Sequence, residues 1–254
     1  KLGNTDSVRN EGMIHAISKI SKYNNKPKFD IQILPSNIIL NDSAWTIGQS
    51  EITYALSERV MDINNFVLHT DYQSISANGR ASTLPEDSIS VTLQNVNVDY
   101  LLSYTEAKKA ISIMGPATGQ AHIYSVFSDP MLEAQAQIRN GGLNGVCLGD
   151  VIAEATLDRE HNNILIHGQI IDSTQYVIAE VNGKVVPENR WWGLDITCDG
   201  VNIHFIDAWT KGVIANPQGK GYGHIKVEGQ KRNVWVTGRA LAKDAQLTVP
   251  QIGV

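Results

Sequence analysis

The chain has 254 residues, enough for one large β-domain or two domains of ordinary size. Charged residues make up 19% of it and the formal net charge is -5, which argues against a general nucleic-acid binder. No stretch reaches the ~18 consecutive apolar residues of a membrane-spanning helix, and no apolar signal segment follows a charged start. Because the chain begins with Lys1 and not with methionine, we expect a piece of a longer protein, with any membrane anchor outside the piece.

Apolar and polar residues alternate along most of the chain. A period of two is typical of β-strands with one dry face and one wet face. The segment 12–21 fits a strand rather better than a helix, and the whole chain predicts about fifteen to eighteen short strands. The clearest alternation lies in the segments 28–34, 88–94, 163–170 and 201–207, which read KFDIQIL, SISVTLQ, NILIHGQI and VNIHFID.

Helix is expected at one place, the segment 98–109 (VDYLLSYTEAKK), and there for only one or two turns. Between the alternating segments lie residues that tolerate positive φ, which predict turns. The predicted turns are Asn24-Asn25, Pro35-Ser36, Asn41-Asp42, Asn78-Gly79, Asn140-Gly141-Gly142, Asn182-Gly183 and Asp199-Gly200.

Two stretches of the chain resemble each other. The pattern G-x-[AG]-H-I opens at Gly119 and again at Gly221, a separation of 102 residues, and each copy is followed by two alternating strands. The copies place His122 and His224 at equivalent wet-face positions. We therefore expect a single elongated segment, 1–254, with repeat-like sub-units at about 28–115, 116–172 and 173–254. Glycines are expected to let the sheet bend sharply or opposing walls approach at Gly79, Gly119, Gly168, Gly223 and Gly238.

Patterns typical of catalysis or metal binding do not occur in the sequence. None of the seven histidines belongs to an HExxH motif, and neither a G-x-S-x-G elbow nor a Walker A motif is present. Asp158, Glu160 and His161 cluster in the segment LDREHNN, which we interpret as a solvated turn. The glycine-rich segment GKGYGH carries Lys220 but lacks the residue order of a phosphate loop. We expect no enzyme, no catalytic residue, no metal site and no cofactor.

Two pairs of residues leave alternatives open. Cys147 and Cys198 do not form a CxxC motif, so they predict no zinc site, and either a disulfide or two free thiols fits them. Trp191 and Trp192 are adjacent, so in a strand they point to opposite faces and at most one of them could serve a sugar-binding platform.

The order of these elements resembles the TamB/AsmA-like group of bacterial envelope proteins, close to the TamB type. A strand and a Pro-Ser turn lead to the Trp45-x-Ile47 strand, and an x-I-x-A-x-G strand follows and ends at Gly79. The segment 93–102 (LQNVNVDYLL) matches the strand-to-short-helix element, and 115–138 matches the glycine-studded strand with its Asp-Pro turn. The segment 125–128 departs from the family pattern, because it replaces the glycine that usually ends this strand.

The resemblance implies an all-β fold, an elongated and strongly curved β-sheet that is U-shaped in section (a β-taco or open β-groove). It implies many short strands, one short helix and an apolar concave lining. As lining of a lipid groove we predict Ile31, Ile33, Ile52, Ile89, Val91, Leu93, Ile123, Leu132, Ile138, Ile164, Ile166, Ile203, Phe205, Ile225, Val227, Val234 and Val236.

The resemblance also implies a function. Such proteins resemble periplasmic bridges, anchored in the inner membrane, that carry phospholipid to the outer membrane or support outer-membrane protein assembly (the translocation and assembly module). The implied partners are phospholipid acyl chains and an outer-membrane barrel protein of the assembly family. Excised from its parent, the fragment should form dimers or head-to-tail stacks through its open sheet edges.

Two other classes of protein are weighed against this one. A secreted β-sandwich could bind glycans through Trp45, Trp191, Trp192, Trp209 or Trp235, and its two sheets would close over one core. An outer-membrane barrel fragment would need strands of ~9–11 residues with aromatic girdles, which the sequence does not indicate.

Overall fold

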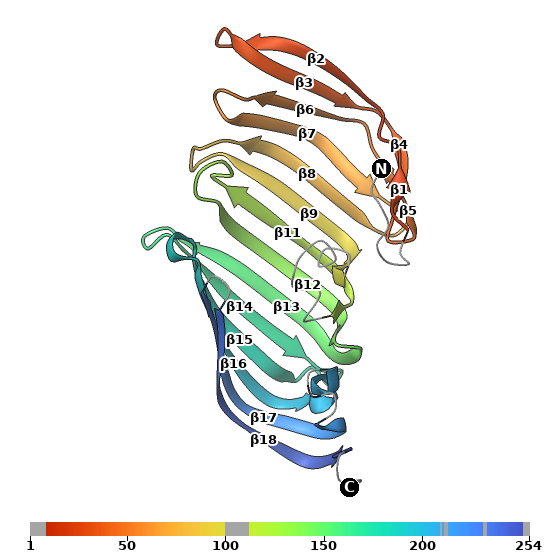
Figure 1. Ribbon diagram of the computed structural model, residues 1–254, viewed down its shortest axis with the longest axis vertical. Coiled ribbons are helices and arrows are strands. Elements are labelled where there is room, and N and C mark those ends of the chain that lie inside the picture. Colours follow the sequence, from red (N-terminus) through yellow and green to blue (C-terminus); the bar gives the residue numbers. More distant parts are fainter. Residues whose placement is uncertain (1–8, 100–111, 209, 211–212, 231–232, 251–254) are drawn as a thin grey trace. The chain divides into compact units, whose positions relative to one another are not determined.

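The computed structural model describes residues 9–99, 112–208, 210, 213–230 and 233–250. These residues form an all-β fold, as predicted, whose strands belong to one large antiparallel sheet that is not closed (Figure 1). They make eighteen strands, which agrees with the predicted number. The helix predicted at 98–109 lies almost wholly outside the described residues. In the part of the chain that is described, no helix has the length and apolar character needed to span a membrane.

Contacts divide the chain into two units, which are described separately. Unit 1 comprises Lys1–Val96 and Thr118–Ala134, and unit 2 comprises Asn97–Ala117 and Gln135–Val254. The first strands are β1 (Glu11–Gly12), β2 (Ala16–Tyr23), β3 (Lys26–Ile33), β4 (Ser36–Leu40), β5 (Ser43–Ile47), β6 (Ser50–Ala55), β7 (Val60–His69), β8 (Ser74–Ala81) and β9 (Ser88–Asn97). They are followed by β10 (Ile113–Met114), β11 (Pro116–Tyr124), β12 (Met131–Leu143), β13 (Val146–Asp158), β14 (Asn163–Ile171), β15 (Val177–Val186), β16 (Trp191–Asn202), β17 (Ala215–Gln230) and β18 (Asn233–Thr248).

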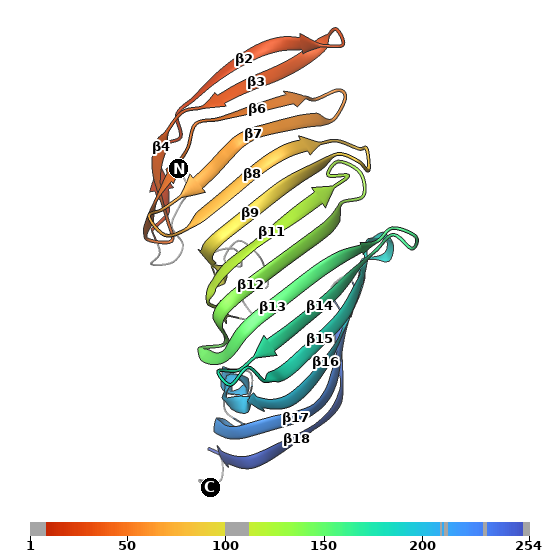
Figure 2. The same cartoon turned by 180° about the vertical axis from the view of Figure 1, so that it is seen from behind.

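In unit 1 the antiparallel order is β2-β3-β6-β7-β8-β9. The β4–β5 hairpin is inserted between β3 and β6, and β5 pairs with the end of β7 while β1 pairs with β4. In unit 2 the strands β13 to β18 pair in chain order, each with the next. Figure 2 shows the same succession of strands from behind.

The hairpin turns of unit 1 use the predicted asparagines. Asn24 and Asn25 have φ of 46° and 62°, and Asn41 and Asp42 have φ of 48° and 62°. Two consecutive residues at positive φ are what a tight turn between twisted antiparallel strands requires. The turns predicted at these two pairs are confirmed, and the chain also breaks at Pro35 between β3 and β4.

Four other predicted turns are wrong, because their residues lie inside strands. Asn78-Gly79 belongs to β8, 140–142 to β12, Asn182-Gly183 to β15 and 199–200 to β16. Strands that run through these points are longer than expected, and β17 and β18 reach sixteen residues each.

Asparagine at positive φ makes irregular positions within strands as well as turns. Asn65 (φ 56°) sits where the register of β7 against β8 shifts, and its backbone N–H donates to Asn78 Oδ1 at 2.6 Å. Asn140 (φ 47°) likewise donates to Asp150 Oδ1 at 2.8 Å. In both cases the backbone N–H of the irregular residue has no partner in the strand pairing, and a side-chain oxygen of the adjacent strand accepts its hydrogen bond. The strand therefore continues past the irregular residue.

The fully buried core is small in both units. In unit 1 it includes Trp45, Ile47 and Val96, and in unit 2 Ile178, Ala179 and Val201 form one buried cluster. Most other apolar strand residues are half-buried, which is the arrangement of a single sheet layer and not of two closely packed layers.

The prediction of a strand over 201–207 is wrong beyond its first residues. β16 ends at Asn202, and Ile203–Ala208 form a 3₁₀ helix, η3. Phe205 packs against the buried cluster of unit 2, and its carbonyl accepts a hydrogen bond from Asn144 Nδ2 at 3.1 Å. The apolar residues of this segment are therefore placed by contact with a buried cluster at the ends of several strands. They do not alternate between the two faces of one strand.

Three of the five singled-out glycines have a backbone that requires glycine. Gly79, Gly223 and Gly238 have φ of 128°, 148° and 153°, and a Cβ on Gly223 would lie 2.2 Å from the carbonyl oxygen of Arg239. At Gly168 a Cβ would meet its nearest atoms at the ordinary distances of 3.5 and 3.9 Å. Gly119 is not among the positive-φ glycines.

We therefore expect Gly223→Ala to lower the free energy of unfolding by about 2 kcal/mol or more, because it combines backbone strain with a steric clash. Gly168→Ala, in the same unit, should change it by less than about 1 kcal/mol. Urea unfolding followed by circular dichroism measures both. Equal losses for the two variants would contradict the assignment of Gly223 as a position that only glycine can fill.

Candidate functional site

The strand register of unit 1 gathers apolar side chains on one face of the sheet. Residues opposite each other in antiparallel strands point to the same face. One row crosses five strands and consists of Ile31, Ile52, Ile63, Gly79 and Ile89. The rows beside it contain Ile33, Val91 and Leu93, together with Phe66, Leu68 and Ile75. All six lining residues predicted between Ile31 and Leu93 therefore share this face, which we call apolar face 1.

The opposite face of unit 1 carries charges. Asp30, Thr53, Asp62 and Arg80 form a row across four strands. Lys28 pairs with Asp30 at 2.8 Å, and Arg80 pairs with Asp62 at 3.3 Å. This face suits solvent, so the two faces of the sheet differ sharply in polarity.

Unit 2 repeats the arrangement over six consecutive strands, β13 to β18. Its longest apolar rows define apolar face 2, and they run Leu157-Ile164-Val185-Trp192-Gly229-Val234, Ala155-Ile166-Gly183-Leu194-Val227-Val236 and Ala153-Gly168-Val181-Ile196-Ile225-Gly238. Six predicted lining residues lie here: Ile164, Ile166, Ile225, Val227, Val234 and Val236.

The side chains of the two apolar faces stay accessible. Ile31, Ile52, Ile166 and Ile225 are half-buried, and only Ile89 among the predicted lining residues is buried, at 8% exposure. On β18 the exposure rises, to 59% for Val234 and 65% for Val236. An apolar ligand could thus reach both faces from solvent.

The other five predicted lining residues lie outside these rows. Ile123 and Leu132 belong to unit 1, Ile138 belongs to unit 2, and all three are half-buried on β11 and β12. Ile203 and Phe205 lie on η3. They still reach apolar face 2, because Phe205 packs against the buried cluster that contains Ala179, and the side chain of Ile203 fills the space where Gly221 lacks a Cβ.

Several residues of the apolar faces were not predicted. Ile63 and Phe66 share apolar face 1 although three residues separate them, because the irregular position at Asn65 shifts the register between them. Leu194, Ile196 and Cys198 lie on apolar face 2, and their alternation in the segment GLDITCDG was a signal that could have identified them.

The described tryptophans do not all lie on one face of the sheet. Trp45 is buried at 3% exposure. Trp191 and Trp192 point to opposite faces, as predicted: Trp192 covers Gly229 on apolar face 2, and Trp191 covers Gly193 on the other side. Trp235 is half exposed beside Glu228, and Trp209 lies outside the described residues.

The titratable groups of the described chain form no group of three or more that could hold a metal ion. His161 contacts Asp158 at 2.9 Å in the β13–β14 turn. Desolvation acts to raise the pKa of Asp158, but the hydrogen bonds from His161 and nearby positive charge together outweigh it and hold that pKa below its ordinary value. His224 lies on the polar face of unit 2, 3.6 Å from Asp195, and His122 is half-buried near Tyr124.

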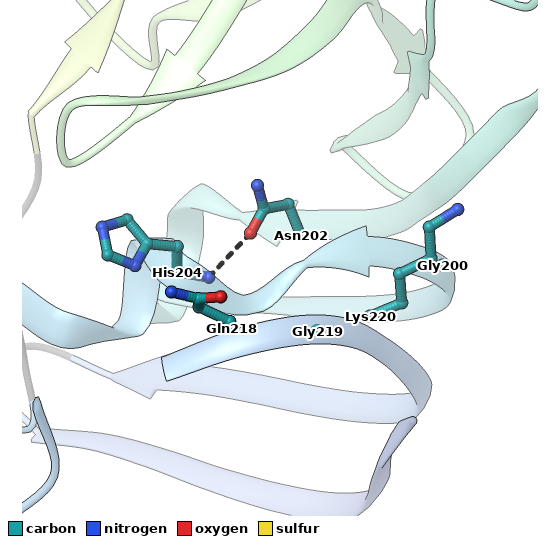
Figure 3. Close-up of a pocket in the computed structure, with 6 residues that line it drawn as sticks. All are labelled: Gly200, Asn202, His204, Gln218, Gly219 and Lys220. Carbon is teal, nitrogen blue, oxygen red and sulfur yellow. Dashed lines mark hydrogen bonds between the residues drawn. The ribbon is translucent and has the colours of Figure 1, made fainter. Parts of the chain in front are cut away.

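Two cavities of the described structure lie within single units. One of ≈ 370 Å³ in unit 1 is lined mainly by polar residues, including Lys19, Asp30 and Glu51, with Ile31 and Ile52 at its wall. The other, of ≈ 520 Å³, lies in unit 2 around Asn202, His204 and Lys220 (Figure 3). Neither is an enclosed apolar pocket of the kind that selects one small molecule.

No protein-family model, no curated protein and no solved structure matches the chain.

Both cysteines are free thiols in this structure. Cys147 is exposed, whereas Cys198 is half-buried on apolar face 2, where burial raises the pKa of its thiol. Only the thiolate reacts with alkylating reagents, so a raised pKa leaves Cys198 with less thiolate at a given pH.

We expect iodoacetamide to modify Cys147 before Cys198. In a Cys147→Ser variant, the alkylation rate of Cys198 should keep rising with pH beyond the ordinary thiol pKa of about 8.5. Mass spectrometry of timed aliquots measures both rates. Faster alkylation of Cys198 than of Cys147 at neutral pH would contradict the half-buried position of Cys198.

Proposed function

We propose that the chain is a segment of a periplasm-spanning protein, whose apolar faces 1 and 2 hold phospholipid acyl chains as lipid moves between the inner and outer membranes. Support of outer-membrane protein assembly, through a barrel partner of the assembly family, belongs to the same proposal. The proposal includes a U-shaped section that turns these faces inward as the lining of a groove.

One observation carries this proposal: rows of apolar residues continue across five and six strands without interruption by a charged side chain. Moving an acyl chain out of water gains about 0.8 kcal/mol for each CH₂ group. A broad aliphatic surface supplies this gain evenly. Lipid can then slide along it, whereas a deep pocket would hold one molecule in place.

The opposite faces support the same function. The face of each unit opposite its apolar face carries ion pairs such as Lys28 with Asp30 and Lys226 with Glu228, while a lipid headgroup would stay in solvent at the open side of the groove. These charges keep one side of the sheet hydrated while the other side remains apolar. Passive transfer of this kind needs no catalytic group.

A glycan-binding sandwich is less well supported. Its defining feature is two sheets packed face to face, while the strands here belong to one antiparallel sheet.

A charge on an apolar face should stop lipid binding. We expect Ile225→Asp to reduce the amount of bound phospholipid at least tenfold, because a carboxylate placed against acyl chains must be desolvated, and tenfold corresponds to only about 1.4 kcal/mol. Val236→Asp should have the same effect with less risk to the fold, since Val236 is 65% exposed. Binding is measured with a fluorescent phospholipid and by lipid extraction.

The matched control is Thr237→Asp, which adds the same charge one residue along β18 but on the polar face, opposite Lys226. It should bind lipid as the unaltered chain does. If Val236→Asp and Thr237→Asp bind equal amounts of lipid while circular dichroism shows both folded, the apolar face is not the lipid site.

The sheet edges predict self-association. Among the described strands, β18 pairs only with β17, and all sixteen of its residues are exposed. An edge of this length leaves a row of backbone donors and acceptors available to another chain. We expect dimers or head-to-tail stacks in light scattering after size exclusion, and Trp235→Lys combined with Leu241→Lys should shift them toward monomer. A monomer over the whole accessible concentration range would contradict this expectation.

A further inference from the structure

The larger of the two cavities lies in unit 2, and none of the described residues that line it carries a carboxylate. Its walls, shown in Figure 3, come from Gly200, Asn202, His204, Gln218, Gly219 and Lys220. The backbone N–H of His204 donates to Asn202 Oδ1 at 3.0 Å, so the amide NH₂ group of Asn202 remains able to donate to a ligand. Gln218 and Lys220 supply further N–H donors. This donor set favours an anion over a cation.

A second observation concerns charge. Lys220 and Lys243 lie directly opposite each other in the β17–β18 register, on the polar face of unit 2. Like charges in a direct cross-strand pair repel each other. The Lys243 ammonium lies 4.5 Å from the centroid of the Tyr222 ring, and neither lysine forms an ion pair with a described residue. An anion placed between the two ammonium groups would remove this repulsion.

Two carboxylates close to the pocket, those of Asp199 and Asp172, form contacts with other groups. Asp199 accepts a hydrogen bond from the hydroxyl of Tyr176. Asp172 accepts hydrogen bonds from the Thr174 hydroxyl at 2.7 Å and from the Tyr176 backbone N–H at 3.0 Å. These bonds hold the pKa of Asp172 below its ordinary value, with a smaller contribution from the charge of Lys220. The two acids are therefore fixed within their own contacts and do not pair with the lysines.

The backbone leaves room for a ligand at this point. Gly200 has φ of 98° at an irregular position of β16, and the atoms nearest to the place where a Cβ would stand are Tyr222 Oη at 3.7 Å, Lys220 Cδ at 3.8 Å and Tyr222 Cε1 at 3.9 Å. The side chains of Lys220 and Tyr222 thus border a space that any larger residue at position 200 would narrow.

We propose that this pocket binds a phosphate-type anion, either inorganic phosphate or the phosphate of a headgroup or other phosphomonoester. Lys220 and Lys243 supply the positive charge, and Asn202, Gln218 and the Tyr222 hydroxyl donate hydrogen bonds to the oxygens. The site lies on the polar face, so it goes beyond the proposed function and is independent of acyl chains on apolar face 2.

The first experiment is a titration of the full chain with inorganic phosphate, followed by calorimetry and by backbone amide chemical shifts. We expect saturable binding that weakens as sodium chloride is added. Lys220→Ala and Lys243→Ala should each raise the Kd at least fivefold. The matched control, Lys226→Ala, removes a lysine from the same strand and face that is already paired with Glu228 at 3.1 Å, and it should leave the Kd unchanged.

Flotation with phosphatidylglycerol vesicles distinguishes the sources of the phosphate. Flotation that is lost in Lys220→Ala but kept in Val236→Asp identifies a lipid headgroup as a ligand of this site. Saturable phosphate binding without flotation identifies a free phosphate or phosphomonoester. The proposal is overturned if phosphate does not bind saturably, or if Lys226→Ala weakens binding as much as Lys220→Ala does. Loss of flotation in Val236→Asp alone bears on the proposed function and leaves the anion site standing.

Discussion

The constraint on which the rest of the structure depends is an apolar sheet face that the protein covers only in part. Removing apolar surface from water contributes about 25 cal/mol for each Å². The isoleucines and valines of these faces are only half-buried in the folded chain, so burying the rest of their surface would release further free energy. The strands are nevertheless well defined, because their backbone ladders satisfy donors and acceptors within the sheet. The apolar face itself stays partly exposed, and in the proposed function the acyl chains of phospholipids cover it.

The details of the backbone protect this division between faces. A one-residue slip in register would send every apolar side chain of a strand to the wet face. At Asn65 and Asn140 the chain departs from regular pairing, and a side-chain oxygen of the neighbouring strand accepts a hydrogen bond from the backbone N–H of the irregular residue. Positive-φ glycines such as Gly223 let two backbones approach more closely than a Cβ permits. Unit 2 can therefore present an apolar surface on one side and, on the other, a pocket rich in donors.

Much of the fold could be predicted from alternation alone. Period two predicted the β-strands and placed Ile31, Ile164 and Ile225 on apolar faces, because side-chain direction in a regular strand depends only on parity. Parity fails where a strand contains an irregular residue, and for this reason Ile63 and Phe66 lie on one face against the simple count.

Turn prediction failed for a related reason. Asparagine and glycine tolerate positive φ both in tight turns and inside strands, and local sequence does not distinguish the two. Asn24-Asn25 turns the chain, whereas Asn182-Gly183 runs through β15, where the Asn182 side chain contacts His167 and Leu194 fills the space beside Gly183. The 3₁₀ helix that carries Phe205 was predicted as a strand, because its apolar residues alternate with polar ones in the sequence. Pairing with neighbouring strands decides whether such a residue turns the chain or continues a strand, and local sequence does not reveal this pairing.

Native mass spectrometry of the purified chain, with extraction and identification of any bound lipid, tests the central claim most directly. The account predicts heterogeneous phospholipid at less than one molecule per chain, because an open aliphatic face binds acyl chains loosely and without selecting one species. A single mass without lipid, unchanged after incubation with phospholipid vesicles, would contradict it.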